Sequence, residues 1–134
     1  MRKILIATHS YLADGLKKTV EFIIGERPDI SILTAYVEEN FDIIKEIESV
    51  FSHLSEKDDL IVLVDILGGS VSNAFAHYHE RENFYLISGV NLSLILEVAA
   101  SLEQDTGKVI EKGIASGKQG ILFVNELFGE EENF

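Results

Sequence analysis

The chain of 134 residues contains no cysteine, which excludes disulfides, zinc sites built from thiolates, and cysteine nucleophiles. It also lacks an apolar run of the roughly 20 residues that a membrane-spanning helix needs. Met1-Arg2-Lys3 leads directly into a predicted strand, so the amino terminus shows no signal-peptide pattern. We therefore expect a globular domain in the cytoplasm.

Basic residues are few: 11 Lys and Arg stand against 23 Asp and Glu, which gives a formal net charge of −12. A surface of this kind repels phosphate backbones, so we expect no nucleic-acid partner. It favours a basic protein at the docking step. Most of these carboxylates are explained equally well if they only keep the protein soluble and take no part in docking.

Apolar runs with strand character alternate with segments in which apolar residues recur every three or four positions. Asn40 is the expected cap of the second helix. We expect one domain over residues 1–128, followed by an acidic tail over residues 129–134. The predicted strands cover residues 3–7, 30–37, 60–64, 84–88 and 120–125, and the predicted helices cover residues 11–24, 40–54, 70–80, 92–102 and 104–116.

This alternation, with short connections, predicts a three-layer, doubly wound α/β fold with a mostly parallel sheet covered on both faces. The strand order 2-1-3-4 is taken from the flavodoxin-like folds, which match this pattern most often. Right-handed crossovers bring the carboxyl ends of all parallel strands to one edge of the sheet. Residues that follow the first and third strands should therefore meet at that edge.

His9 closes the first predicted strand, and Asp65 closes the third. A carboxylate that accepts a hydrogen bond from one ring nitrogen fixes the tautomer of an imidazole and leaves the other nitrogen as a nucleophile. Such a nitrogen can attack phosphorus and hold a phosphoryl group. A histidine after a strand or a capping aspartate is ordinary by itself; the predicted convergence of the two loops is what indicates a catalytic pair.

The loop after Asp65 has the features of an anion-binding turn. Glycines allow the backbone to approach an anion, and the amides that open the next helix lie at its positive end. Side-chain hydroxyls would add further donors. Because positioning and charge stabilisation suffice for phosphoryl transfer, we expect neither a metal nor a cofactor. The candidate phosphoryl-binding residues are Gly68, Gly69, Ser70, Val71, Thr8 and Ser10.

Three blocks of sequence, in this order and spacing, resemble one known family. They are Ile-Ala-Thr-His-Ser at residues 6–10, Leu-Val-Asp-Ile-Leu-Gly-Gly-Ser-Val-Ser-Asn-Ala at residues 63–74, and Ile-Ser-Gly-Val-Asn-Leu-Ser-Leu-Ile-Leu-Glu at residues 87–97. The family is the IIA component of mannose-type sugar phosphotransferase systems. The resemblance extends to Gly-Lys-Gln-Gly-Ile-Leu-Phe at residues 117–123.

The resemblance implies that His9 accepts a phosphoryl group on Nε2 from the phosphocarrier HPr and passes it to a IIB component, which works with membrane IIC and IID components. It implies that Asp65 orients His9 and that Ser70 contacts the phosphoryl group. It also implies a homodimer, in which a last strand near Ile121 to Val124 is antiparallel and exchanged in some relatives. Val71 and Leu67 depart from the proline and tryptophan of many relatives, which bears on partner fit.

Alternative functions remain on the same fold. The first is a regulatory version of the domain, from a sugar-operon activator or as the phosphorylated subunit of a dihydroxyacetone kinase. The Gly-Gly-Ser-x-x-Asn-Ala block favours transport over the kinase subunit, and a start at Met1 favours a standalone IIA protein over an excised module. The second is a passive flavin- or anion-binding module, which would need a phosphate-binding loop rich in Ser, Thr and Gly after the first strand; Thr8-His9-Ser10-Tyr11-Leu12 is a poor match.

Overall fold

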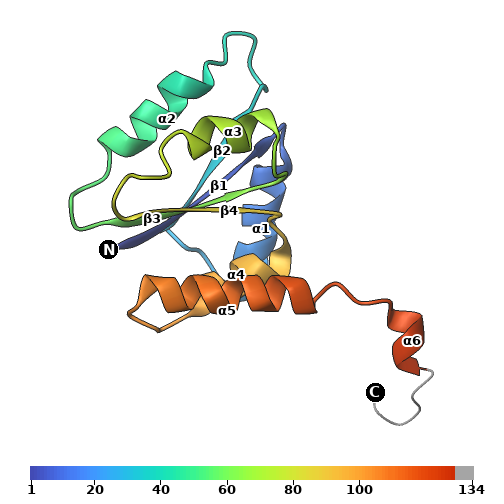
Figure 1. Cartoon of the computed structure of the whole chain (residues 1–134). Coiled ribbons are helices and arrows are strands. Elements are labelled where there is room, and N and C mark those ends of the chain that lie inside the picture. Colours follow the sequence, from blue (N-terminus) through green and yellow to red (C-terminus); the bar gives the residue numbers. More distant parts are fainter. Residues whose placement is uncertain (129–134) are drawn as a thin grey trace.

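A computed structural model describes residues 1–128 of the chain. Strands and helices alternate up to the fourth helix, after which two further helices follow (Figure 1). The elements are β1 (Arg2–His9), α1 (Leu12–Ile24), β2 (Ile30–Ala35), α2 (Ile43–Ser52), β3 (Asp59–Val64), α3 (Ser70–Ala76), β4 (Phe84–Ser88), α4 (Leu92–Ala100), α5 (Thr106–Gln119) and α6 (Val124–Phe128).

The four strands form one sheet in the order β2-β1-β3-β4, and every neighbouring pair is parallel. The α/β class and the order 2-1-3-4 predicted from the sequence are therefore confirmed. In the register, His9 lies opposite Ala35 of β2, and Ala7 lies opposite Val64 of β3. The loops after β1, β2 and β3 consequently leave the same edge of the sheet, which we call the carboxyl edge. The opposite edge is the amino edge.

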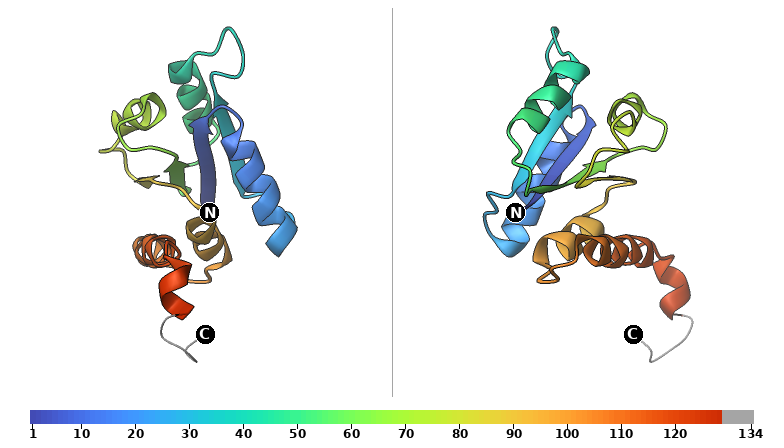
Figure 2. Two further views of the ribbon diagram at one scale, coloured as in Figure 1. Left: turned by 90° about the vertical axis from the view of Figure 1, so that its right-hand side faces the viewer. Right: turned by 60° about the vertical axis from the view of Figure 1, so that its left-hand side comes forward.

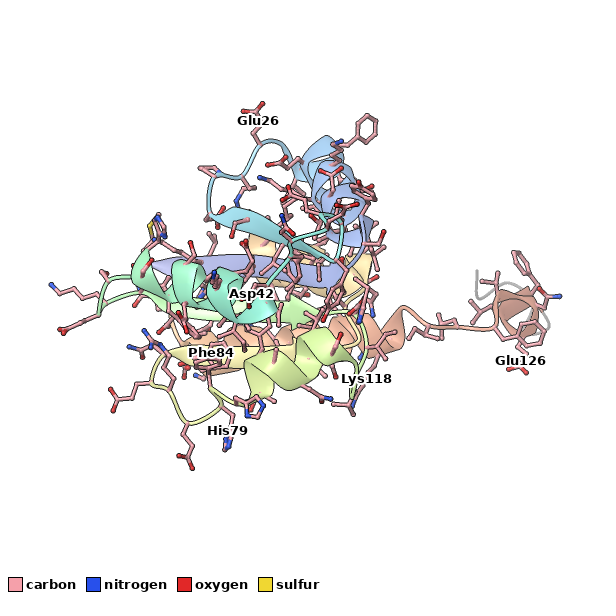
Figure 3. The ribbon with its side chains drawn as sticks, turned by 90° about the horizontal axis from the view of Figure 1, so that it is seen from above. Glu26, Asp42, His79, Phe84, Lys118 and Glu126 are labelled. Atoms are coloured by element: carbon pink, nitrogen blue, oxygen red, sulfur yellow. The ribbon has the colours of Figure 1, made fainter. Side chains whose placement is uncertain are left out.

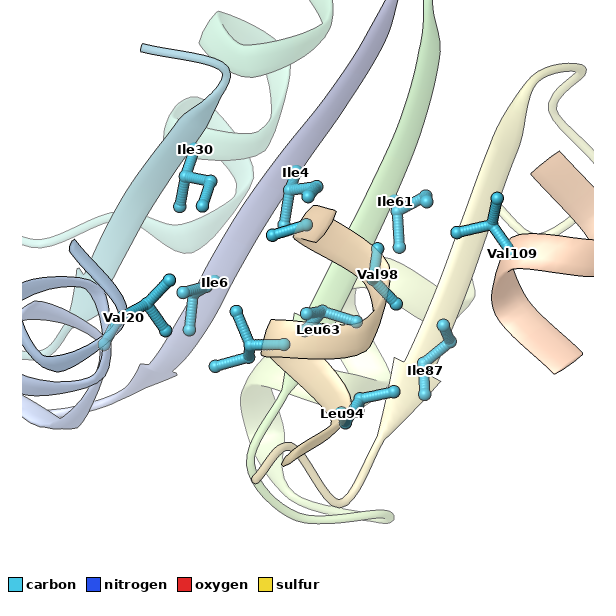
Figure 4. Packing of buried hydrophobic residues seen from close by; sticks show 13 residues of the cluster. Ile4, Ile6, Val20, Ile30, Ile61, Leu63, Ile87, Leu94, Val98 and Val109 are labelled. Carbon is cyan, nitrogen blue, oxygen red and sulfur yellow. The ribbon is translucent and has the colours of Figure 1, made fainter. Parts of the chain in front are cut away.

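Side chains alternate across the sheet and build a core on each face. Ile4 and Ile6 of β1 point to the face covered by α1, α4 and α5, whereas Leu5 and Ala7 point to the face covered by α2 and α3 (Figures 1 and 2). Figure 4 shows the first of these cores, in which Val20 and Leu94 reach the sheet from α1 and α4. Burying one such side chain completely contributes about 1.5–3 kcal/mol. These two cores fix the loops at the carboxyl edge.

Three of the helices begin at a side chain that accepts hydrogen bonds from the first turn. Asp42 caps α2 by accepting from the backbone N–H groups of Ile44 and Lys45, so the prediction that Asn40 caps this helix was wrong. Asn91 caps α4, and Asp105 caps α5. Caps of this kind stabilise a helix by roughly 1 kcal/mol each because they satisfy backbone donors that have no acceptor within the helix.

The last strand predicted over residues 120–125 does not form in the single chain. Residues 121–123 pair with no strand, and Val124 begins the short helix α6. Helix α5 continues to Gln119, and the chain then leads away from the sheet, so that α6 with Glu126 stands apart from the other helices (Figure 3). The side chains that suggested a buried strand are instead exposed, by 76% for Ile121 and 64% for Phe123.

A short apolar run forms a strand only when a sheet edge lies within reach, and this segment has none beside it in the single chain. Its exchange in a dimer stays a prediction, since only one chain is described. The acidic tail predicted over residues 129–134 lies outside the described residues. Within residues 1–128, no helix has the length and hydropathy that a membrane span requires.

Candidate active site at the carboxyl edge

His9 and Asp65 meet at the carboxyl edge, as the sequence predicts. One carboxylate oxygen of Asp65, Oδ2, lies 2.9 Å from the backbone nitrogen of His9 and 2.9 Å from its ring nitrogen Nδ1. An ionised carboxylate only accepts hydrogen bonds, so Nδ1 carries the hydrogen. The lone pair of the neutral imidazole is therefore on Nε2, on the side of the ring away from Asp65.

The environment of Asp65 keeps its carboxylate ionised. Burial raises the pKa of Asp65, but the hydrogen bonds from the backbone and ring of His9 lower it by more, so the pKa lies below its ordinary value. The second oxygen, Oδ1, accepts a hydrogen bond of 3.0 Å from the backbone of Ile66. With three donors around it, the carboxylate is fixed in place and in turn fixes the His9 ring.

Ser70 and Gly69 lie on the other side of the imidazole. The hydroxyl oxygen of Ser70 is 3.2 Å from Nε2 of His9. Gly69 approaches the ring so closely that a Cβ atom on it would lie 3.1 Å from Cε1 of His9. Gly68 has a φ of +81°, which other residues rarely adopt. The Gly-Gly-Ser turn is thus shaped by its contact with His9.

Helix α3 begins directly at this turn, with Gly69 as its N-cap. The first intrahelical bond runs from the backbone of Asn73 to the carbonyl of Gly69, at 2.9 Å. The amides of Ser70 and Val71 in the first turn have no acceptor within the helix, and they lie at its positive end. The side chain of Val71 is buried in the core, so only its backbone can serve an anion.

The two other predicted hydroxyls are placed differently. Thr8 is completely buried, and its hydroxyl oxygen accepts a hydrogen bond of 2.8 Å from the backbone of Ala13. It therefore holds the start of α1 and does not reach the site. Ser10 is exposed beside His9 with a φ of +55°, and its backbone N–H donates to the carbonyl of Ala35.

Tyr36 is at the site although the sequence analysis did not select it. Its hydroxyl donates a hydrogen bond of 2.8 Å to the Ser70 hydroxyl, and its ring centre lies 5.8 Å from that of His9. Phe41 packs against the Tyr36 ring in a T-shaped arrangement. Tyr36 follows β2 just as His9 ends β1, so the predicted strand order alone places it at this edge.

The site is an open surface. The side chain of His9 is 37% exposed, and the apolar side chains of Leu12, Ile66 and Leu67 beside it are at least half exposed. Two cavities, of about 500 and 490 Å³, lie at the amino edge of the sheet, far from His9. An open, partly apolar surface around a nucleophile suits a protein as the reaction partner better than an enclosed small molecule.

Comparison of the sequence with known proteins connects this geometry to one family. Residues 3–114 match the family model described as the IIA component of the fructose phosphotransferase system, of the mannose type. The chain is 26% identical over 122 residues to the mannose-specific EIIAB component of Escherichia coli, covering 88% of this chain but only 38% of that protein. It is 28% identical to the fructose-specific EIIA component of Bacillus subtilis, covering 77% of this chain and 72% of the relative.

Solved structures agree. A candidate sugar phosphotransferase permease from Klebsiella pneumoniae superposes with a TM-score of 0.90 at 38% identity, covering 95% of this chain and 93% of that one. The EIIA component from Streptococcus agalactiae superposes with a TM-score of 0.80 at 26% identity, covering 94% and 99% of the two chains. Both similarities extend over nearly the whole chain.

Proposed function

The chain belongs to the family of mannose- and fructose-type IIA components of the sugar phosphotransferase system, and on this premise we propose that His9 carries a phosphoryl group between two proteins. The donor is phospho-HPr, and the acceptor is a IIB component. The observation that carries the proposal is the pairing of Nδ1 of His9 with Asp65 at 2.9 Å, which leaves the lone pair on Nε2, in a side chain that is 37% exposed.

Each transfer exchanges one bond to phosphorus for another. When HPr donates, the lone pair on Nε2 of His9 bonds to phosphorus, and the electron pair of the broken bond stays with the donor. Nδ1 keeps its hydrogen, so the ring becomes cationic, and the negative charge of Asp65 at 2.9 Å stabilises it. When IIB accepts, its nucleophile bonds to phosphorus and the electron pair of the N–P bond returns to Nε2.

The surroundings of Nε2 supply the donors that the phosphoryl oxygens need. The Ser70 hydroxyl is 3.2 Å from Nε2, and the amides of Ser70 and Val71 open α3 on the same side. Gly69 places no side chain between the His9 ring and the backbone at the start of α3. Such fixed donors act mainly by positioning and by stabilising charge, which phosphoryl transfer requires.

The open surface supports the protein partners named in this proposal. Leu12, Ile66 and Leu67 give it apolar area that can be buried on docking, and the net charge of −12 favours a basic donor. We further propose that the protein acts as a homodimer next to membrane IIC and IID components. Because the chain covers only part of the E. coli relative, the IIB acceptor is here a separate molecule or a separate domain.

The test is to incubate the protein with phosphoenolpyruvate, enzyme I and HPr and to measure its intact mass. We expect one acid-labile phosphoryl group on the wild type, none on His9→Ala, and an unchanged adduct on the control His79→Ala, whose side chain is exposed on a distant turn. An adduct that persists in His9→Ala would contradict the proposal. Onward transfer to a dihydroxyacetone kinase subunit, and not to IIB, would favour the alternative on the same fold.

A further inference from the structure

We propose that Tyr36 is a positioning residue for phosphoryl transfer, because its hydroxyl sets the direction in which the Ser70 hydroxyl donates its hydrogen. This inference rests on the proposed function of His9. It concerns a residue that neither the strand-end pair His9 and Asp65 nor the Gly-Gly-Ser turn includes. Its basis is the contact of 2.8 Å between the hydroxyls of Tyr36 and Ser70.

The hydrogen bonds around His9 form a chain with one direction. Asp65 can only accept, so Nδ1 of His9 donates to it, and Nε2 is left as an acceptor. Each hydroxyl has one hydrogen. Tyr36 uses its hydrogen on the Ser70 oxygen at 2.8 Å, so the hydrogen of Ser70 is free for Nε2 at 3.2 Å. Tyr36 therefore donates to Ser70, Ser70 to His9, and His9 to Asp65.

The same direction suits the phosphorylated state. Once Nε2 is bonded to phosphorus, its lone pair is no longer available, and the Ser70 hydrogen turns to a phosphoryl oxygen at the same place. Ser70 is exposed, so without a partner its hydroxyl would rotate and bond to water. By occupying the oxygen of Ser70, Tyr36 keeps the hydrogen on the side of the reacting nitrogen in both states.

The position of Tyr36 is held firmly for an exposed side chain. Its ring lies between His9, at 5.8 Å, and Phe41, at 5.1 Å between ring centres. Its backbone has a φ of +66°, in the left-handed region that residues other than glycine rarely adopt. Such a conformation persists only where the surrounding structure imposes it, and here it turns the ring toward His9.

The test compares Tyr36→Phe, which keeps the ring and removes only the hydroxyl, with the wild type. We measure the rate of phosphorylation by phospho-HPr over a range of donor concentrations. We expect kcat to fall by about three- to ten-fold, the size of one lost hydrogen bond, while KM stays constant because the docking surface is unchanged. The control Tyr78→Phe removes a hydroxyl from a ring packed on Phe51, away from the site, and should leave both constants unchanged.

A double-mutant cycle separates this role from a general structural one. If Tyr36 acts through Ser70, then Tyr36→Phe has no further effect in a Ser70→Ala background. An unchanged kcat in Tyr36→Phe, a change in KM alone, or the same fall in kcat with and without Ser70 would each overturn the inference. A failure of the proposed function would look different: the wild-type protein itself would then take no phosphoryl group on His9.

Discussion

The two ends of strand β3 each have an aspartate bound to partners from distant parts of the chain, and the partners differ in kind. At the amino edge, Asp59 accepts a hydrogen bond of 2.6 Å from Thr106, whose hydroxyl also accepts hydrogen bonds from the Arg2 guanidinium. At the carboxyl edge, Asp65 pairs with an imidazole. The Thr106 hydroxyl uses its hydrogen on Asp59 and its oxygen on the charged Arg2, whereas the imidazole keeps an unused nitrogen.

The amino edge is therefore a clamp, and the carboxyl edge is a reactive site. The guanidinium of Arg2 also binds the backbone carbonyls of Glu103 and Gln104, so it ties the start of the chain to the region before α5. Cavity volume would have selected the wrong end, because cavities of about 500 and 490 Å³ open at the amino edge. What distinguishes the ends is the chemistry of the partner on the aspartate.

The largest expected effect comes from removing the carboxylate at each end in turn. In Asp65→Ala, His9 loses the group that fixes its tautomer and orientation, and we expect phosphoryl acceptance to slow by about 10- to 100-fold, the usual size for an orienting partner of a histidine. In Asp59→Ala, the clamp is lost but the site is intact, and the rate should remain that of the wild type. Quench-flow measurement with phospho-HPr gives both rates.

Stability provides the control for this pair. Both substitutions leave hydrogen-bond donors without their acceptor, so both should lower the free energy of unfolding by about 1–3 kcal/mol. Denaturant unfolding at neutral pH measures this. Equal losses of transfer rate in the two variants would contradict the distinction between clamp and site.

A smaller effect is expected from Gly69→Ala. The added methyl group would lie 3.1 Å from Cε1 of His9 and 3.4 Å from the carbonyl of Ile66, so the ring must shift by a few tenths of an ångström. We expect a fall of about ten-fold in transfer rate, since small displacements of a reacting group are costly. The matched control is Gly15→Ala in α1, where a Cβ meets nothing within 4 Å.

Gly15→Ala should keep the wild-type rate and stabilise the protein by roughly 0.5–1 kcal/mol, because alanine favours a helix over glycine. The rates come from the same phosphorylation assay, and the stabilities from thermal or denaturant unfolding. If Gly69→Ala transfers as fast as Gly15→Ala, the close approach of Gly69 to His9 has no role in positioning.

The sequence allowed the sheet to be predicted because each strand carries an apolar pattern of its own. Leu60 to Val64 is apolar throughout, which is typical of a strand buried on both faces. The prediction of a strand after α5 failed because the local pattern was not enough. Ile121 and Phe123 are as apolar as strand residues, but such a run forms a strand only if a neighbouring strand is there to pair with it, and both side chains are exposed. The capping residue of α2 was predicted wrongly because Asn and Asp are both favourable N-caps. Sequence alone does not show whether the helix begins after Asn40 or after Asp42.

At the site, the sequence indicated His9, Asp65, Gly69 and Ser70 because they follow strand ends that a parallel sheet brings together. Thr8 was assigned to the site because the predicted strand ended at residue 7, whereas β1 continues to His9 and buries Thr8 within the sheet. Tyr36 was missed because the predicted strand 30–37 included it, whereas β2 ends at Ala35 and Tyr36 lies in the loop at the site. The role of its hydroxyl is indicated only by the 2.8 Å contact with Ser70, and the backbone of Tyr36 has a positive φ that the sequence does not reveal.

The smallest expected effect is on stability in acid, where an aspartate at each edge loses its contribution to the free energy of unfolding. The backbone of Ser55 and the ammonium groups of Lys3 and the amino terminus lower the pKa of Asp58, at the amino edge, to about 2. The pKa of Asp65 is also below its ordinary value, mainly because of His9. A carboxyl with a lowered pKa in the folded state stabilises the protein above its unfolded pKa of about 3.9, and this contribution is lost as the pH falls through the folded value.

We therefore expect the difference in unfolding free energy between the wild type and Asp58→Asn to be constant at neutral pH and to vanish only near pH 2. For Asp65→Asn the difference should likewise shrink in acid. Salt separates the two. Besides the Ser55 backbone, the partners of Asp58 are ammonium groups on exposed residues, with side chains exposed by 72% for Met1 and 36% for Lys3, so 1 M salt should screen this part of its contribution. Asp65 relies on short hydrogen bonds from His9 and Ile66, which salt weakens less. If salt reduced both differences equally, the two aspartates would be the same kind of ion pair, and Asp65 would have no special relation to the imidazole.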